Sequence, residues 1–198
     1  MPGTRGRRAD ARRNATAILD AAVECLSRDP DASVADIAQA AGVGRVTLYG
    51  HFASREELLD AVFARAMREA DAALDSLDLE GDPRQAMTLL IRSSWRIVDR
   101  SRALLVAAER GLPHGRIREL HQRPLHRIGR LIERGREQGE FRTDMPVAWL
   151  SAAFYGVLHT TADEITAGRL DEADAPGALT GILLAAFTPP GQPVPTAD

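Results

Sequence analysis

The chain has 198 residues, of which 44% are hydrophobic and 27% charged, and its formal net charge is −3 at pH 7. No segment approaches the roughly 18 consecutive apolar residues of a membrane span, and the N-terminus lacks the apolar core of a signal peptide. A single cysteine, Cys25, excludes an intrachain disulfide, and its apolar neighbours predict a buried, inert thiol. We expect a cytoplasmic protein of one or two small domains.

Charge is distributed unevenly along the chain. Residues 1–55 contain eight arginines against six acidic residues, a balance of +2, whereas the remainder contains 17 against 22, a balance of −5. Five of the arginines lie in the first 13 residues: Arg5, Arg7, Arg8, Arg12 and Arg13. We expect residues 1–11 to form a basic, disordered arm. Such an arm could neutralise phosphates of a nucleic acid or could be a solvated leader, and composition does not separate the two.

Helical signals dominate the N-terminal third. Apolar residues at helical spacing predict a first helix over residues 12–28. A Ser-x-x-Asp capping pattern beginning at Ser33 opens a short second helix, which Gly42 ends. A third helix is predicted over residues 44–52, and residues 53–57 cap and begin a long fourth helix with an acidic first turn.

The rest of the chain is also helical, with glycine and proline at the breaks. Five further helices are predicted over residues 83–99, 101–110, 116–138, 145–167 and 175–187. The final segment, 188–198, is rich in proline and polar residues and is expected to be a disordered tail. The sequence therefore predicts an all-α fold of about nine helices.

The second and third predicted helices have the layout of a helix-turn-helix, in which the second helix of the pair enters the major groove of DNA. On the third helix, Leu48 and Phe52 form an apolar edge, whereas Val46 and Gly50 lie nearly opposite. Gly50 costs about 1 kcal/mol relative to alanine inside a helix, and close approach to another surface is one physical reason for it. A glycine-linked helix pair is also common in all-helical proteins, so the layout alone does not decide for DNA.

Side chains on and beside the third helix suit DNA. Val46 could touch a thymine methyl group, and Arg45 could pair with a guanine edge. The side chains suited to phosphates are Thr47, Tyr49, His51 and Arg55. The complete set of candidate DNA contacts is Ser33, Arg45, Val46, Thr47, Tyr49, Gly50, His51 and Arg55.

Residues 33–62 resemble the DNA-binding region of the tetracycline-repressor (TetR) family of bacterial regulators. The matching positions are Ile37, Ala38, Ala41, Gly42, Val43, Thr47, Leu48, Tyr49, His51, Phe52, Glu56 and Leu58. The departures are Ser33 for Thr, Gly44 for Ser, Val46 for a frequent Gly, Arg55 for Lys, and Gly50 for a larger side chain. The resemblance implies that Thr47, Tyr49, His51 and Arg55 hold phosphates while Arg45 and Val46 read bases.

The same resemblance implies a helix-turn-helix domain over residues 12–56 and a helical effector-binding and dimerisation domain over residues 57–187. It implies a homodimeric repressor that binds a pseudo-palindromic operator and is released by a small apolar or aromatic effector. Effector binding would move the fourth helix and thereby change the spacing of the two DNA-binding heads.

A stripe of small residues in the predicted helix 145–167 agrees with a dimer, because small side chains let another helix approach closely. With residues of the last helix, the candidate interface comprises Ala148, Ala152, Gly156, Thr160, Leu179, Ile182, Leu183 and Ala186. Packing of that stripe within the chain is the alternative.

Two apolar helix faces with a few polar tips are candidates for the effector pocket. Their residues are Met87, Ile91, Trp95 and Val98 on one helix and Phe154, Tyr155, Leu158 and His159 on another. Trp95 and His159 are equally explicable as ordinary core residues.

Enzyme motifs are not found. Gly42-Val43-Gly44 begins like a dinucleotide-binding loop, but no strand precedes it and its sixth position is Thr47. The spacing of His114, His121 and His126 is not that of a helical metal pair. We therefore predict a non-enzymatic protein without cofactor or metal. A helical protein-interaction module that does not bind DNA is the alternative.

Overall fold

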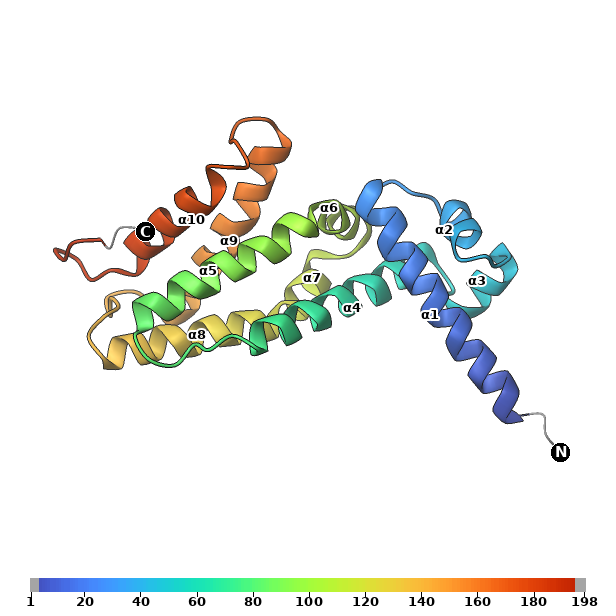
Figure 1. Cartoon of the computed structure of the whole chain (residues 1–198), viewed down its shortest axis with the longest axis horizontal. Coiled ribbons are helices and arrows are strands. Elements are labelled where there is room, and N and C mark those ends of the chain that lie inside the picture. Colours follow the sequence, from blue (N-terminus) through green and yellow to red (C-terminus); the bar gives the residue numbers. More distant parts are fainter. Residues whose placement is uncertain (1–3, 195–198) are drawn as a thin grey trace. The chain divides into compact units, whose positions relative to one another are not determined.

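The computed structural model describes residues 4–194, with side chains from residue 10 onward. Within that range the structure contains ten α-helices and no strand (Figure 1), and it divides into two compact units. The predicted all-α fold class is confirmed.

The N-terminal unit comprises the residues up to Arg68 together with residues 101–120. Its elements are α1 (Thr4–Arg28), α2 (Val34–Ala40), α3 (Arg45–His51), the first part of α4 (Arg55–Asp75), α6 (Arg102–Gly111) and α7 (His114–Leu120). The helical spacing of Ile18, Ala22 and Leu26 places all three on one buried face of α1. Against this face pack α2, α3 and α6, so a single hydrophobic core holds the predicted helix-turn-helix.

The C-terminal unit comprises residues 69–100 and the residues from His121 onward. It contains the end of α4, α5 (Pro83–Arg100), α8 (Gln122–Glu137), α9 (Val147–Thr166) and α10 (Ala175–Phe187). α5 packs against α8, α9 and α10, and α9 also packs against α8 and α10. Leu90, Phe154 and Phe187 are among the side chains that fill its separate core. No helix in residues 4–194 is long and apolar enough to cross a membrane.

Two helix boundaries differ from the sequence prediction. α1 begins at Thr4, so residues 4–11 are helical where the composition suggests a disordered arm, and residues 1–3 lie outside the described range. Arginine and alanine are good helix formers, and extending a helix costs less than nucleating one. The single helix expected over 116–138 is divided at His121, where Pro124 in the first turn of α8 lacks the amide that would continue α7. The division gives ten helices where the sequence predicts about nine.

The division into units also differs from the predicted boundaries of 12–56 and 57–187. Residues 101–120 cluster with the N-terminal helices, because Leu104, Leu105 and Leu112 are buried in the same core as Leu58 and Leu59 of α4. At the other end of the chain, residues 188–194 are not helical, and residues 195–198 of the expected tail lie outside the described range.

A glycine on α8 sets how closely the following loop approaches that helix. The Gly135 carbonyl accepts hydrogen bonds from the Glu140 amide at 2.8 Å and the Phe141 amide at 3.1 Å. This arrangement lays the Phe141 ring over Gly135, and a Cβ at Gly135 would overlap that ring. The ring also packs against Phe187 of α10 with 5.9 Å between centroids, so it has little freedom to move.

We predict that Gly135→Ala lowers the free energy of unfolding by roughly 1–3 kcal/mol, the usual cost of overpacking a core. Gly129→Ala on the same helix is the matched control, because its Cβ would meet Val147 Cγ1 at an ordinary 3.6 Å. Urea unfolding followed by circular dichroism measures both, and the control should gain up to about 1 kcal/mol from helix propensity. Equal midpoints for the two variants would contradict the packing described.

Candidate nucleic-acid interface

The turn between α2 and α3 is fixed by a glycine that ends α2. Gly42 adopts a φ of 67°, in the left-handed region that glycine enters without steric penalty. Its amide donates to the Gln39 carbonyl at 3.1 Å, and the Val43 amide donates to the Ala38 carbonyl at 3.0 Å. This pair of hydrogen bonds is a Schellman motif, which closes the helix end and directs the chain into the next helix.

The start of α2 is held by a reciprocal cap. The Asp36 amide donates to Ser33 Oγ at 3.2 Å, while the Ser33 amide donates to Asp36 Oδ2 at 2.9 Å and the Ser33 hydroxyl to the same oxygen at 2.6 Å. These hydrogen bonds favour the ionised carboxylate and hold the pKa of Asp36 below its ordinary value. The capping pattern read from the sequence is confirmed, and the Ser33 hydroxyl is engaged within the chain.

α3 has one anchored edge and one exposed edge. Leu48 is fully buried and Phe52 nearly so, in the core shared with α1 and α4. On the other side Val46 is 88% exposed, and Arg45, Thr47, Tyr49 and Gly50 are also exposed. The anchored edge fixes the rotation of α3 about its axis, so these side chains face outward together.

No intramolecular contact explains the glycine in the middle of α3. A Cβ at Gly50 would have no neighbour within 4 Å, so packing within the described structure does not require glycine there. A β-branched residue as exposed as Val46 likewise gains nothing from its own fold. Both residues make physical sense if another surface approaches this edge of α3.

Arg55 is placed differently from the other predicted contacts. Its Nη1 donates to the Ala32 carbonyl at 2.5 Å and its Nη2 to the Pro30 carbonyl at 3.5 Å, and the side chain is half-buried. The guanidinium therefore ties the start of α4 to the loop that precedes α2. This geometry makes Arg55 a positioning residue for the helix pair and does not support the predicted phosphate contact.

Comparison with known proteins identifies this segment. Residues 18–62 match the family described as bacterial regulatory proteins, tetR family. Residues 18–62 are therefore a tetR-family segment. The HTH-type transcriptional repressor LfrR of Mycolicibacterium smegmatis is 40% identical over 71 residues, which make up 36% of this chain and 38% of that repressor. The match thus spans little more than a third of the length of this curated relative.

Solved structures extend the likeness to both units. The transcriptional regulator FadR from Bacillus subtilis, in complex with stearoyl-CoA, superposes with a TM-score of 0.72 at 19% identity, covering 87% of this chain and 98% of that one. LfrR from Mycobacterium smegmatis, in complex with proflavine, gives 0.66 at 24% identity, covering 89% and 97%. At these identities the comparison shows that this chain shares their fold.

The residues predicted for the dimer interface separate into two groups. Ala148, Gly156 and Thr160 are exposed along one edge of α9, Ala152 beside them is half-buried, and Ile182 on α10 is exposed with Ala186 half-buried. Leu179 and Leu183, in contrast, are buried in the core of their own unit. Those two side chains cannot meet a partner in this conformation, so they are removed from the candidate interface.

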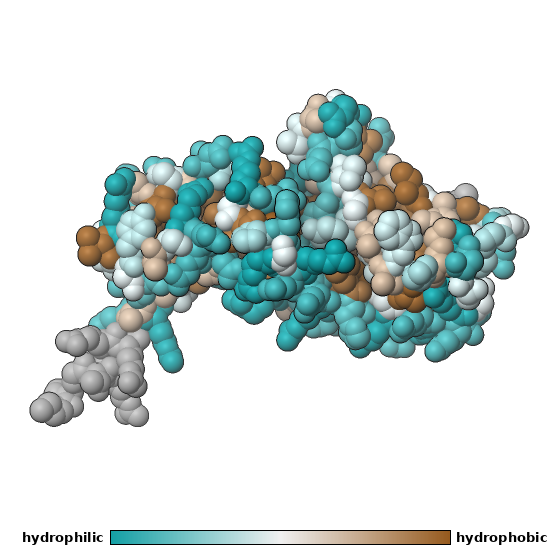
Figure 2. Space-filling view, turned by 180° about the vertical axis from the view of Figure 1, so that it is seen from behind, coloured by the Kyte–Doolittle hydropathy of each residue, from teal (hydrophilic) through white to brown (hydrophobic). Residues whose placement is uncertain are grey.

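Sequence reasoning missed one large side chain on this face. Trp149 of α9 is 64% exposed although tryptophan is normally much more buried. It lies next to Ala148 in the chain, and the outer side of α10 adds the small residues Ala178, Gly181 and Ala185. Figure 2 shows hydrophobic residues exposed on the surface of the C-terminal unit. A search for bulky residues flanking the small-residue stripe would have found Trp149.

The residues predicted for the effector pocket come together, but as packed core. Met87, Ile91 and Trp95 of α5 and Phe154 and Leu158 of α9 are buried in one hydrophobic cluster, against which Val98 packs. The two clefts described in the C-terminal unit are lined by other residues, on either side of the end of α4. A ligand that enters between α5 and α9 therefore requires these side chains to move apart.

Tyr155 and His159 form an aromatic cluster with His121, which precedes α8. The ring centroid of His159 lies 4.1 Å from that of Tyr155 and 5.5 Å from that of His121. His159 Nδ1 is buried without a hydrogen-bond partner in the described structure. Burial, with a smaller contribution from the neighbouring His121, lowers the pKa of His159 to about 4.

We predict that Arg55→Ala lowers the free energy of unfolding by roughly 1–3 kcal/mol, because two backbone carbonyls lose a charged donor. Arg45→Ala is the control, since the exposed Arg45 has no hydrogen bond or ion pair in the described structure and should change stability by less than about 0.5 kcal/mol. Thermal unfolding of both variants measures the two changes in stability. A loss for Arg45→Ala as large as for Arg55→Ala would contradict the assignment of Arg55 as a positioning residue.

We further predict that His159 stays neutral at pH 7 and destabilises the fold as pH falls. Because the folded-state pKa lies near 4, below the ordinary 6.5, the unfolded chain binds the proton more tightly, and stability decreases from about pH 6.5 down to about pH 4. The contribution of His159 is of order 1–3 kcal/mol, so the loss of stability over this pH range should be smaller by that amount in His159→Phe. Unfolding at several pH values measures the loss, and NMR titration of His159 with a midpoint at or above 6.5 would refute the prediction.

Proposed function

We propose that this protein is a DNA-binding transcriptional repressor and not an enzyme. The observation that carries the proposal is the exposed edge of α3, which a Schellman turn and the buried Leu48 hold in a fixed orientation within a tetR-family segment. Similarity to the repressor LfrR, 40% identical over 71 residues, supports it. We infer a cytoplasmic location, because a repressor must have access to the chromosome.

The roles of individual residues follow from their chemistry and exposure. Arg45 pairs with a guanine edge and Val46 packs on a thymine methyl group in the major groove. Thr47, Tyr49 and the half-buried His51 donate hydrogen bonds to phosphates and set the register of α3. Because Gly50 has no side chain, the backbone of α3 can approach the bases closely at this position.

We infer a homodimer, which presents two copies of α3 to a pseudo-palindromic operator. The exposed edge of α9 and the outer side of α10 supply the interface, with Trp149 and Ile182 as its large apolar side chains. Around them Ala148, Gly156 and Gly181 allow close approach of helices. Two helices from each protomer would form a four-helix contact.

We propose that a small molecule bound in the C-terminal unit regulates DNA binding. The structural relatives named above were solved with stearoyl-CoA and with proflavine, which supports an apolar or aromatic effector here. Entry between α5 and α9 would separate Trp95 from Phe154 and Leu158. Such a ligand favours the conformation to which it binds more tightly, and it releases DNA only if that conformation binds the operator less well.

The test is selection of bound duplexes from a random DNA pool by the purified, ligand-free protein at near-physiological salt, where non-specific phosphate binding is weakened. We predict enrichment of an inverted repeat. On the selected site, the Arg45→Ala, Tyr49→Ala double variant should bind at least about tenfold more weakly, the usual cost of losing a base contact.

Arg118→Ala is the matched control, because this exposed arginine lies on α7, outside α2 and α3. It should bind the selected site as the wild type does. No enriched sequence from folded protein, or full binding by the double variant, would refute the proposal in favour of a protein-interaction module.

A further inference from the structure

An open cleft lies between the last turns of α4 and the first part of α8. Its volume is about 550 Å³, and it is lined by Asp71, Asp75, Gln122, Arg123, His126, Arg127 and Arg130. All of its residues belong to the C-terminal unit. Not one of them is an apolar side chain, so the cleft does not suit the apolar effector proposed above.

Four cationic or titratable side chains of α8 line up along this cleft. The first of them is Arg123, and His126, Arg127 and Arg130 follow it by three, four and seven residues. This spacing places all four on one face of the helix. A face with three guanidinium groups repels itself unless anions compensate it. Among residues 10–194, two carboxylates line the cleft, those of Asp71 and Asp75.

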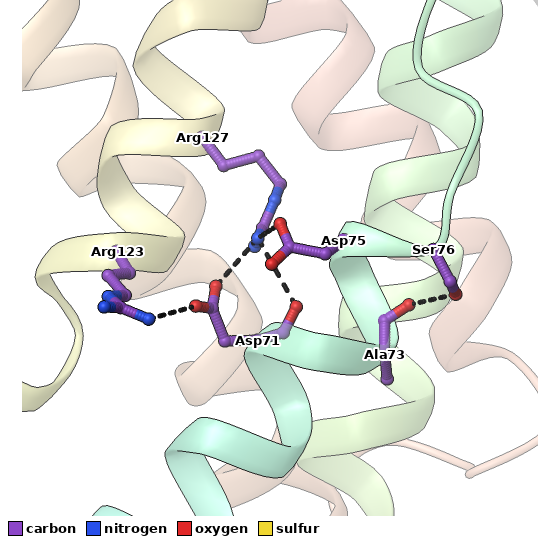
Figure 3. A network of polar contacts seen from close by, with 6 residues as sticks. All are labelled: Asp71, Ala73, Asp75, Ser76, Arg123 and Arg127. Carbon is purple, nitrogen blue, oxygen red and sulfur yellow. Dashed lines mark hydrogen bonds and ion pairs between the residues drawn. The ribbon is translucent and has the colours of Figure 1, made fainter.

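Arg127 is the buried centre of the network (Figure 3). Its side chain is 9% exposed, and its Nη2 donates to Asp71 Oδ1 at 2.7 Å, to the Asp71 carbonyl at 3.4 Å and to Asp75 Oδ1. Its Nη1, also buried, has no hydrogen-bond partner in the described structure. A buried donor of this kind is costly to leave unpaired, so the arginine retains capacity for a further acceptor.

The two carboxylates are held unequally. Asp71 is buried and also accepts from Arg123 at 3.4 Å, whereas Asp75 is 66% exposed and, among the described residues, pairs only with Arg127. Exposed partners contribute little to an ion pair because water competes for them. Arg130 is exposed, and no carboxylate in residues 10–194 pairs with it. The cleft therefore has surplus positive charge and one replaceable anion.

We propose that this cleft is a binding site for an anionic group, a carboxylate or a phosphate, which replaces Asp75 on Arg127 and is also held by Arg123 and Arg130. Guanidinium groups present paired N–H donors that match the oxygens of both anions. Asp71 remains on Arg127 and keeps its side chain oriented toward the incoming group. Gln122 and His126, which also line the cleft, add further hydrogen-bonding groups to the site.

A regulatory consequence rests on the proposed function. Asp71 and Asp75 are in the last turns of α4, the helix that begins at Arg55 beside the helix-turn-helix. Displacing Asp75 would remove one of the contacts by which α8 holds the end of α4. An anion in the cleft would then act on the same helix that the effector mechanism invokes.

The experiment is a calorimetric titration of the full chain, without DNA, with inorganic phosphate and separately with acetate, at ionic strength held constant with chloride. We expect saturable binding, and the ion that binds more tightly identifies the chemical source of the group. In Arg123→Gln, Arg130→Gln the affinity should fall about tenfold or more. Because no DNA is present, failure here is distinct from failure of the proposed repressor function.

Arg12→Gln, Arg118→Gln is the matched control, because it removes the same charge from exposed sites in the N-terminal unit. It should bind within twofold of the wild type. Asp75→Asn should bind severalfold more tightly, since the competing carboxylate is removed while Arg127 keeps Asp71. Arg127 itself is left intact, because its loss would leave the buried Asp71 with only the 3.4 Å contact to the exposed Arg123 and would threaten folding.

Three results would overturn the proposal: no saturable binding of either ion to the wild type, equal loss of affinity in the control variant, or unchanged affinity in Asp75→Asn. Circular dichroism confirms that each variant is folded before titration.

Discussion

The orientation of α3 depends on the burial of Leu48 in the core of the N-terminal unit. A seven-residue helix is too short to be stable by itself in water, so its direction and rotation come from what anchors it. Leu48 and Phe52 provide that anchor, and the turn at Gly42 sets where the helix starts. Arg55 completes the arrangement by holding the loop ahead of α2. Without these constraints the exposed residues of α3 would form no surface of defined shape.

The C-terminal unit uses a different physical principle at the end of α4. Around Asp71 and Arg127 the structure buries an ion pair where apolar side chains would pack more cheaply. Such a pair specifies geometry more than it adds stability, and the neighbouring arginines exceed what that geometry needs. The adjacent core of α5, α9 and α10, in contrast, is closely packed and apolar. One unit thus contains both a polar and an apolar environment in which a ligand group can be recognised.

Local sequence patterns predict the helix-turn-helix. The contacts between residues far apart in the chain could not be predicted in this way. The cap at Ser33 and the turn at Gly42 involve residues only a few positions apart, and both match their sequence patterns. Arg55 contacts carbonyls 23 and 25 residues earlier, and Arg127 reaches an aspartate 56 residues earlier. No spacing rule predicts such partners. α10 is apolar around most of its circumference, so its sequence could not show that Leu183 faces inward and Ile182 outward.

The open space around Gly50 separates recognition from folding. Since a Cβ introduced there would meet nothing within 4 Å, packing within the described structure does not require glycine at this position. Val46 is likewise exposed, and Arg45 makes no hydrogen bond or ion pair in the described structure. Substitutions at these positions can accumulate without drawing on the small stability margin of the protein. The exposed edge of α3 can therefore change its chemistry by single substitutions, while the helices behind it stay the same.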